Sequence, residues 1–130
     1  MNTNTEAYNV QFDQSINAVV MEWNGYSNSN QFREGTELML NTLIQNKTSK
    51  VLAQLKDMTL IGSEDMVWLE KQFLPRAIKF GFKTIAIVKP QSHFNRVAID
   101  TIREKVNEQI MSVNVFDTID EALDYLKNTN

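Results

Sequence analysis

Hydrophobic and polar residues alternate near the N-terminus in a way that is typical of strands. Tyr8, Val10 and Phe12 alternate with polar residues, which indicates a strand with one buried face. A second segment, 18–23, is apolar and rich in valine, and the turn-forming residues 13–15 lie between the two. Because so short a connection favours antiparallel pairing, these two segments are predicted to form a hairpin.

Helical and strand-like patterns alternate along the rest of the chain. Apolar residues spaced three or four apart predict helices, and short aliphatic runs predict strands. Strands are predicted at 8–13, 18–23, 50–56, 83–89 and 112–116, and helices at 29–46, 63–80, 93–110 and 119–126. This alternation implies right-handed crossovers and a mainly parallel sheet. We therefore predict the α/β class, with a five-stranded mixed sheet, four helices and the first strand antiparallel at an edge.

Residues that start, bend and stop helices support these boundaries. Ser63 is expected to be the N-cap of the second helix, so that Ser63→Ala would cost about 1 kcal/mol. Thr118 and Glu121 fit a capping box at the start of the last helix. Pro75 lies inside the second helix, where it lacks an amide hydrogen, and predicts a kink just before it. Gly81 is expected to end that helix.

Apolar residues also indicate which elements lie in the core. Ile85 and Ile87 alternate with Ala86 and Val88, so both faces of that strand are predicted to be buried. In the third helix, the inner face is expected to begin with Phe94.

Composition narrows the chemistry that is available. The chain has 130 residues, a net charge of −3, one histidine and no cysteine. That length fits a single domain, 1–130, in which residues 1–6 are predicted to form a flexible N-terminal tail. The mildly acidic balance argues against nucleic-acid binding. The lack of cysteine and of a second histidine excludes disulfides, thiolate metal sites and multi-histidine metal sites.

No segment indicates targeting or membrane insertion. The first five residues are polar, and the longest apolar runs, such as 85–88, are far shorter than a bilayer span. We therefore expect no membrane span and a cytoplasmic location.

Several segments together carry a resemblance that covers almost the whole chain. They are VMEWNGY at 20–26, VLAQLKDM at 51–58, WL at 68–69 with FLPRA at 73–77 and Gly81, and FD at 116–117 with EALDYL at 121–126. These segments resemble the STAS-like family, the SpoIIAA-like fold of anti-sigma-factor antagonists, and particularly its small stand-alone bacterial members. They consist mostly of core and cap positions, so they are informative about fold rather than chemistry.

The resemblance implies a five-stranded sheet flanked by helices, no cofactor and no catalysis. Members of the family bind a protein partner or, in lipid-carrier-like branches, a small ligand. Regulatory members carry a phosphorylatable serine in a short Asp-Ser/Thr-Ser-Gly sequence after the third strand. Here residues 57–63 are DMTLIGS, so the motif is absent. Ser63 occupies a comparable place at a helix start, and Thr59 is the nearest alternative.

Polar residues gather near the predicted carboxyl ends of the strands, where open α/β sheets bind ligands. The candidate partner or ligand surface comprises Tyr26, Asp57, Thr59, Ser63, Trp68, Lys89 and His93. In the alternative interpretation, these are turn and cap residues, and Trp68 fills space between helices and sheet together with Trp23 and Tyr125.

Catalytic interpretations have little support in the sequence. His93 lacks the serine nucleophile pattern and the orienting acid that a catalytic triad needs. Asp57 and Lys89 resemble the strand-end residues of phosphoacceptor receiver domains. Those domains hold magnesium with an acidic pair, whereas the corresponding strand here offers only Glu22. We predict no catalytic residue, no metal site and no cofactor.

Two functional hypotheses follow for a protein that we do not expect to be an enzyme. The leading one is a regulatory or protein-interaction module of the STAS-like type with an unidentified protein partner. The alternative is a carrier domain that binds a small apolar ligand or lipid in a pocket between helices and sheet. The many large apolar residues in so small a domain also predict a homodimer.

Overall fold

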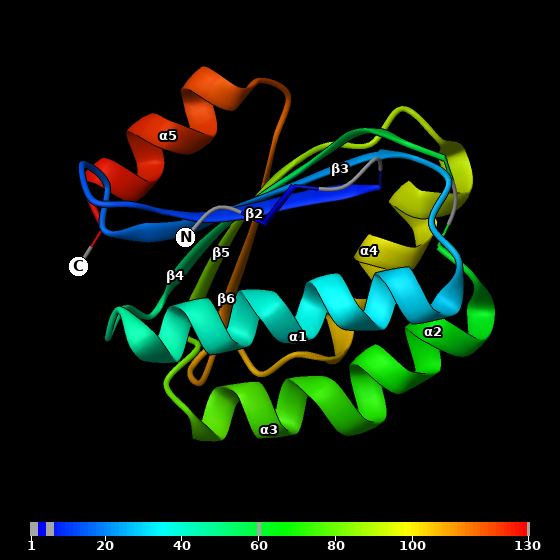
Figure 1. The fold of residues 1–130 in the computed structure, drawn as a ribbon, viewed down its shortest axis with the longest axis horizontal. Coiled ribbons are helices and arrows are strands. Elements are labelled where there is room, and N and C mark those ends of the chain that lie inside the picture. The colour runs from blue at the N-terminus through cyan, green and yellow to red at the C-terminus, as the bar shows by residue number, and fades with distance from the viewer. Residues whose placement is uncertain (1–2, 5–6, 60, 130) are drawn as a thin grey trace.

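The computed structural model describes residues 3–4, 7–59 and 61–129, and among these six strands form one sheet (Figure 1). The order of the strands in space follows their order along the chain. The first two pairs are antiparallel and the remaining pairs are parallel. The strands are β1 (Thr3–Asn4), β2 (Tyr8–Asp13), β3 (Ala18–Gly25), β4 (Lys50–Met58), β5 (Thr84–Val88) and β6 (Ser112–Phe116).

Helices cover both faces of this sheet, unequally. From β3 to β6 each connection moves one strand further in the same direction, and right-handed crossovers then put every connecting helix on one face. Figure 1 shows these helices together below the sheet and the last helix on the opposite side. The helices are α1 (Ser29–Gln45), α2 (Ser63–Trp68), the π-helical turn η1 (Leu69–Phe73), α3 (Leu74–Lys79), α4 (His93–Lys105) and α5 (Ile119–Lys127).

The core is divided by the sheet into a large and a small part. Ile87 of β5 belongs to the large core under α1–α4, whereas Ala86 and Val88 belong to the small core under α5. Ile85 packs, partly buried, against the large core. The prediction that both faces of this strand are covered is therefore confirmed, as are the α/β class and the mixed sheet.

The structure differs from the predictions at the N-terminal edge of the sheet and in the third helix. At the N-terminal edge, β1 pairs with β2, so the sheet has a sixth strand outside the predicted hairpin. Of the predicted tail 1–6, only Thr3 and Asn4 are among the described residues. The third predicted helix ends at Lys105 rather than at residue 110, and Phe94, expected on its inner face, is 74% exposed.

The helix that contains Pro75 is irregular where a kink was predicted. The π-helical turn η1 ends two residues before Pro75, which lies in the first turn of α3. Because proline has no amide hydrogen and crowds the preceding turn, the backbone cannot keep regular α-helical bonding through this region. No helix of the described ranges is both long and apolar enough to span a bilayer.

Lys50 holds α5 against the small core. Its side chain is buried, and its Nζ donates to the backbone oxygens of Leu126 at 2.7 Å and Thr129 at 2.8 Å. These oxygens lie at the C-terminal end of α5, where a cation is favoured by the helix dipole. Burial lowers the pKa of Lys50.

Helices α1 and α3 end in the same motif but with different residues in its left-handed position. Lys47 and Gly81 have φ angles of 53° and 108°. After α1, Lys47 N–H donates to the oxygen of Ile44, and after α3, Gly81 N–H donates to the oxygen of Ile78. Both are Schellman endings, in which glycine avoids the steric cost of a side chain.

Substitutions at Lys47 and Gly81 are expected to change stability in opposite directions. Lys47→Gly should raise the free energy of unfolding by about 0.5–1 kcal/mol, whereas Gly81→Ala should lower it by about 1–2 kcal/mol. Urea unfolding of both variants beside the wild type measures each change. A loss of stability in Lys47→Gly would contradict the proposed strain.

Candidate functional site

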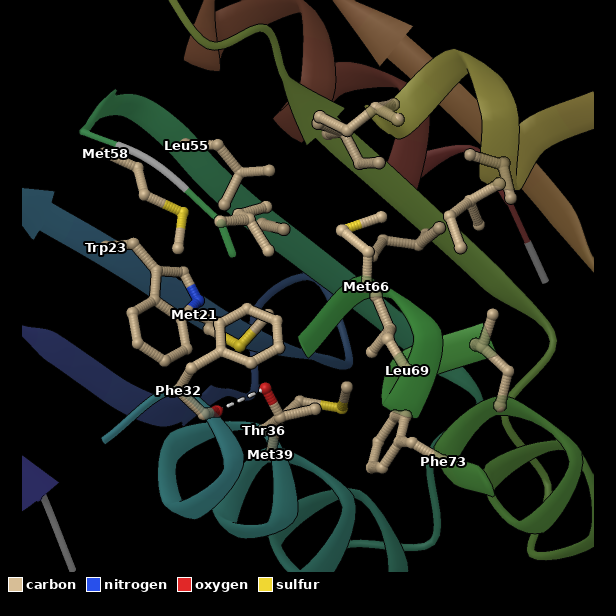
Figure 2. A pocket seen from close by; sticks show the side chains of 18 of the residues that line it. Met21, Trp23, Phe32, Thr36, Met39, Leu55, Met58, Met66, Leu69 and Phe73 are labelled. Atoms are coloured by element: carbon tan, nitrogen blue, oxygen red, sulfur yellow. Dashed lines mark hydrogen bonds between the residues drawn. The ribbon is translucent and has the colours of Figure 1, made fainter. Parts of the chain in front are cut away.

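An apolar cavity of about 100 Å³ lies in the large core, between the sheet and helices α1, α2, α3 and α4. Strands β3, β4, β5 and β6 contribute its floor, and η1 contributes part of its wall. Figure 2 shows side chains from these elements pointing toward one another around it. The alternation of each strand places one row of apolar side chains on this face, so the cavity follows from the sheet itself.

The lining carries almost no polar group. Thr36 is its only residue with a polar side chain beyond the indole of Trp23, among the residues that the structure describes. The hydroxyl of Thr36 donates to the backbone oxygen of Phe32 at 2.7 Å (Figure 2), so it is already satisfied. Within residues 3–4, 7–59 and 61–129, no carboxylate, amine, imidazole or thiol lines this space. The cavity therefore offers burial of apolar surface and no acid, base or nucleophile.

Methionine is concentrated around the cavity. Of the six methionines in the chain, five line it: Met21, Met39, Met58, Met66 and Met111. Methionine side chains are unbranched and polarizable, so they adapt to ligands of different shapes. The lining is thus suited to change shape around an apolar guest.

An aromatic row packs α1 and α2 against the sheet, and it consists of Tyr8, Trp23, Phe32, Trp68 and Phe73. Three of these rings line the cavity: Trp23, Phe32 and Phe73. The ring centroids of Trp23 and Phe32 lie 5.5 Å apart, and those of Trp68 and Phe73 also lie 5.5 Å apart. Gly35 of α1 permits this contact, because a Cβ at this position would lie 2.7 Å from the Trp23 ring. Trp23 and Trp68 are both buried, at 2% and 8% exposure.

A buried amide closes one side of the cavity. Asn95, in the first turn of α4, is 1% exposed. Its Oδ1 accepts from Ile61 N–H at 3.0 Å, and its Nδ2 donates to the oxygen of Met58 at 3.3 Å. Ile61 and Met58 both line the cavity. Asn95 therefore ties α4 to the chain between β4 and α2, a role that sequence reasoning missed because an asparagine in a first helical turn looks like an ordinary polar residue.

A buried carboxylate joins the beginnings of α1 and α2. Asp65 is 4% exposed; its oxygens accept from Ser29 Oγ at 3.0 Å and from Arg33 Nε at 3.2 Å. The Arg33 guanidinium lies 5.2 Å from the centre of the Trp68 ring. Since every charged group here has a protein partner, this cluster holds the two helices together.

Three of the predicted site residues lie together at the ends of β3 and β4. Tyr26, Asp57 and Thr59 are exposed. Asn24 is the register partner of Asp57, and Thr59 N–H donates to the oxygen of Gly25 at 2.9 Å. They belong to the surface and not to the cavity lining.

Lys89 and His93 lie in a separate groove of about 420 Å³ beside α4. Arg96 and Arg103 line the same groove, as does Asp117, whose carboxylate lies 3.6 Å from Lys89 Nζ. The groove is thus open and rich in charge, unlike the cavity.

Ser63 and Trp68 are placed differently from what the sequence indicated. Trp68 is buried, and its ring belongs to the aromatic row. The N-cap prediction for Ser63 is wrong, because Gly62 is the N-cap of α2 and no side chain caps this helix. Met66 N–H bonds to the oxygen of Gly62, so the helix begins one residue earlier than predicted and leaves Ser63 inside its first turn. Ser63→Ala therefore removes no capping hydrogen bond, and the loss of about 1 kcal/mol predicted for it is not expected. The capping box of Thr118 and Glu121 is confirmed.

No three histidine, aspartate or glutamate side chains come together as potential metal ligands within 3–4, 7–59 and 61–129.

Comparison with known proteins bears on the fold. No protein-family model matches the sequence. No curated protein is similar enough to count as a match. Among solved structures, the chain is similar to an uncharacterised protein of the DUF3478 family with a SpoIIAA-like fold, from Shewanella loihica PV-4. The TM-score is 0.68 at 18% identity, over 97% of this chain and 98% of that chain. The chain therefore has the SpoIIAA-like fold that its resemblance to the STAS-like family implied.

Proposed function

We propose that this protein is a non-catalytic binding module whose cavity under the sheet holds a small apolar molecule or one end of an aliphatic chain. The observation that carries the proposal is the lining: apolar side chains from four strands and five helical segments, with five methionines among them, surround an unfilled space. Protein cores normally pack without such spaces, because an unfilled volume forfeits contacts.

The volume sets the size of the guest. An engineered apolar cavity of about 150 Å³ stays dry and binds benzene, so about 100 Å³ suits a group of a few carbon atoms, and benzene fits once methionine side chains of the lining move. A longer chain requires the methionine side chains to move, which their unbranched shape allows. Because the lining has no acid, base or nucleophile, binding without chemistry is the role that it supports.

A role in protein interaction is the second candidate, favoured by the outer face of α4. Phe94 and Val97 are 74% and 48% exposed and lie one turn apart. The cationic groups of Lys89 and Arg96 line the groove beside them. A partner with an apolar anchor and acidic residues would fit this face. Loss of a captured partner in Phe94→Ser but not in Val67→Ser, a matched exposed position on α2, would support this candidate.

The proposal also covers the cellular location of the protein and its oligomeric state. The absence of cysteine fits a reducing compartment, and the similar solved structure is bacterial, so the proposal includes a bacterial cytoplasm. It also includes the homodimer that the sequence predicts.

Ala53→Leu tests the cavity directly. Ala53 is 1% exposed in the middle of β4, and its side chain lines the cavity. With ¹³C-labelled methionine methyl groups, adding benzene should shift the signals of the five lining methionines in the wild type. Ala53→Leu should abolish these shifts, because three added carbon atoms fill the space.

Ala98→Leu is the matched control, since Ala98 is half-buried on α4 and does not line the cavity. It should keep the benzene-induced shifts. A folded Ala53→Leu protein that binds benzene as the wild type does would overturn the proposal.

A further inference from the structure

The open edge of the sheet at β6 has features of an interface. β6 is the last strand of the sheet, and all five of its residues are only half-buried. It contains no charged residue, no proline and no glycine. Natural proteins usually protect an open edge with such residues, because exposed backbone groups pair with other chains.

The backbone of β6 offers a defined set of bonding groups on its outer side. Ser112 N–H donates to Lys83 at 2.8 Å, and the oxygen of Phe116 accepts from Lys89 at 2.9 Å, so these even-numbered residues face β5. Successive residues of a strand direct their backbone groups to opposite sides. Val113 and Val115 therefore direct their N–H and C=O groups outward, where no strand of the described residues lies.

We infer that this edge pairs with β6 of a second copy of the chain, antiparallel and with the twofold axis at Asn114. In this register Val113 lies opposite Val115 of the partner copy, and both pairs exchange their outward N–H and C=O groups. The strand is thus complementary to itself, as a twofold interface requires. Because both copies use the same edge, the pairing closes as a dimer and does not continue as a filament.

Side chains at the two ends of β6 fit the same arrangement. Ile110 before the strand is 52% exposed, and Ile119 after it is 40% exposed. Antiparallel pairing brings Ile110 of one copy near the Ile119 end of the other, so that both are covered. The strand itself carries no charge, so no like charges oppose each other across the axis.

Asn114 provides a sharp test, because only this residue of β6 lies opposite itself. Non-hydrogen-bonded antiparallel partners have Cα atoms about 4.5 Å apart, and like charges there are destabilising. Sedimentation equilibrium should give twice 15.0 kDa for the wild type and 15.0 kDa for Asn114→Lys and Asn114→Asp separately. An equimolar mixture of the two variants should regain the dimer mass, because the charges are then opposite.

Asn41→Lys on the exposed face of α1 is the control and should remain dimeric. This inference rests on the homodimer in the proposed function and not on the ligand cavity. A monomeric wild type would overturn both the homodimer and this interface. Dimeric Asn114→Lys and Asn114→Asp proteins would overturn the interface alone, and a mixture that stays monomeric would overturn the register.

Amide hydrogen exchange of the wild type tests the same interface without any variant. The amides of Val113 and Val115 should exchange more slowly as the protein concentration rises, since pairing covers them. Exchange at these two amides that is fast and independent of concentration would contradict the inference.

Discussion

Replacing Phe73 by alanine should lower the free energy of unfolding by about 3–5 kcal/mol. Phe73 is 1% exposed, and its ring contacts Trp68 on one side while the Arg76 guanidinium lies 5.6 Å from its centre. The substitution removes both contacts and leaves a larger hole in the core. Urea unfolding followed by tryptophan fluorescence measures the loss.

Phe80→Ala is the matched control for this prediction. Phe80 is 57% exposed, so its loss should change stability by about 0.5 kcal/mol or less. Because Phe73 lines the cavity, the Phe73→Ala protein should also gain more stability from added benzene than the wild type does. Equal losses in the two variants would show that Phe73 does not hold this wall in place.

The sheet was predictable because its pattern is local. A period of two along β5 identifies which side chains face each core, and this information is complete within five residues. The capping box at Thr118 was predictable for the same reason, since its partner Glu121 is three residues away. At Ser63 the same reasoning was wrong by one residue, because glycine also adopts the extended conformation of an N-cap.

The contacts that tie the helices to one another could not be read from local patterns. Glu37 and Arg76 form a two-bond ion pair, at 2.7 and 2.6 Å, although 39 residues separate them. Asp65 accepts hydrogen bonds from Ser29 and Arg33 of α1, which lie more than 30 positions earlier in the sequence. A charged residue on a helix is usually solvated, so its sequence position does not identify such a partner.

The cavity lies furthest from sequence reasoning. Its volume is the difference between the space enclosed by four strands and five helical segments and the volume of the side chains that they contribute. Periodicity predicts which residues face this space and not how completely they fill it. One sequence signal was available: five methionines fall on positions that face the sheet or its covering helices. The candidate partner or ligand surface, in contrast, was predicted from the ends of the strands. The structure divides its residues among the ends of β3 and β4, the groove beside α4, the exposed start of α2 and the core.

Alkaline pH should destabilise the protein through Tyr8. Its hydroxyl donates to Glu34 Oε1 at 2.5 Å, and the residue is 1% exposed. Burial, and then the hydrogen bond and negative charge of Glu34, raise the pKa of Tyr8 from 10.0 to about 12. The folded state thus holds this proton more tightly than the unfolded state does. The resulting stability is complete below pH 10 and is lost as pH rises through about 12, with a limiting value of about 3 kcal/mol.

Tyr8→Phe isolates this contribution, because it keeps the ring in the aromatic row and removes the titrating group. Between pH 9 and pH 11, the wild type should lose about 1 kcal/mol more than Tyr8→Phe does, as measured by urea unfolding at each pH. The sign is set by the direction of the pKa shift: a lowered pKa would make the wild type gain stability over the same range. Parallel pH profiles for the two proteins would mean that Tyr8 ionises equally easily in both states, and that its bond to Glu34 does not persist in solution.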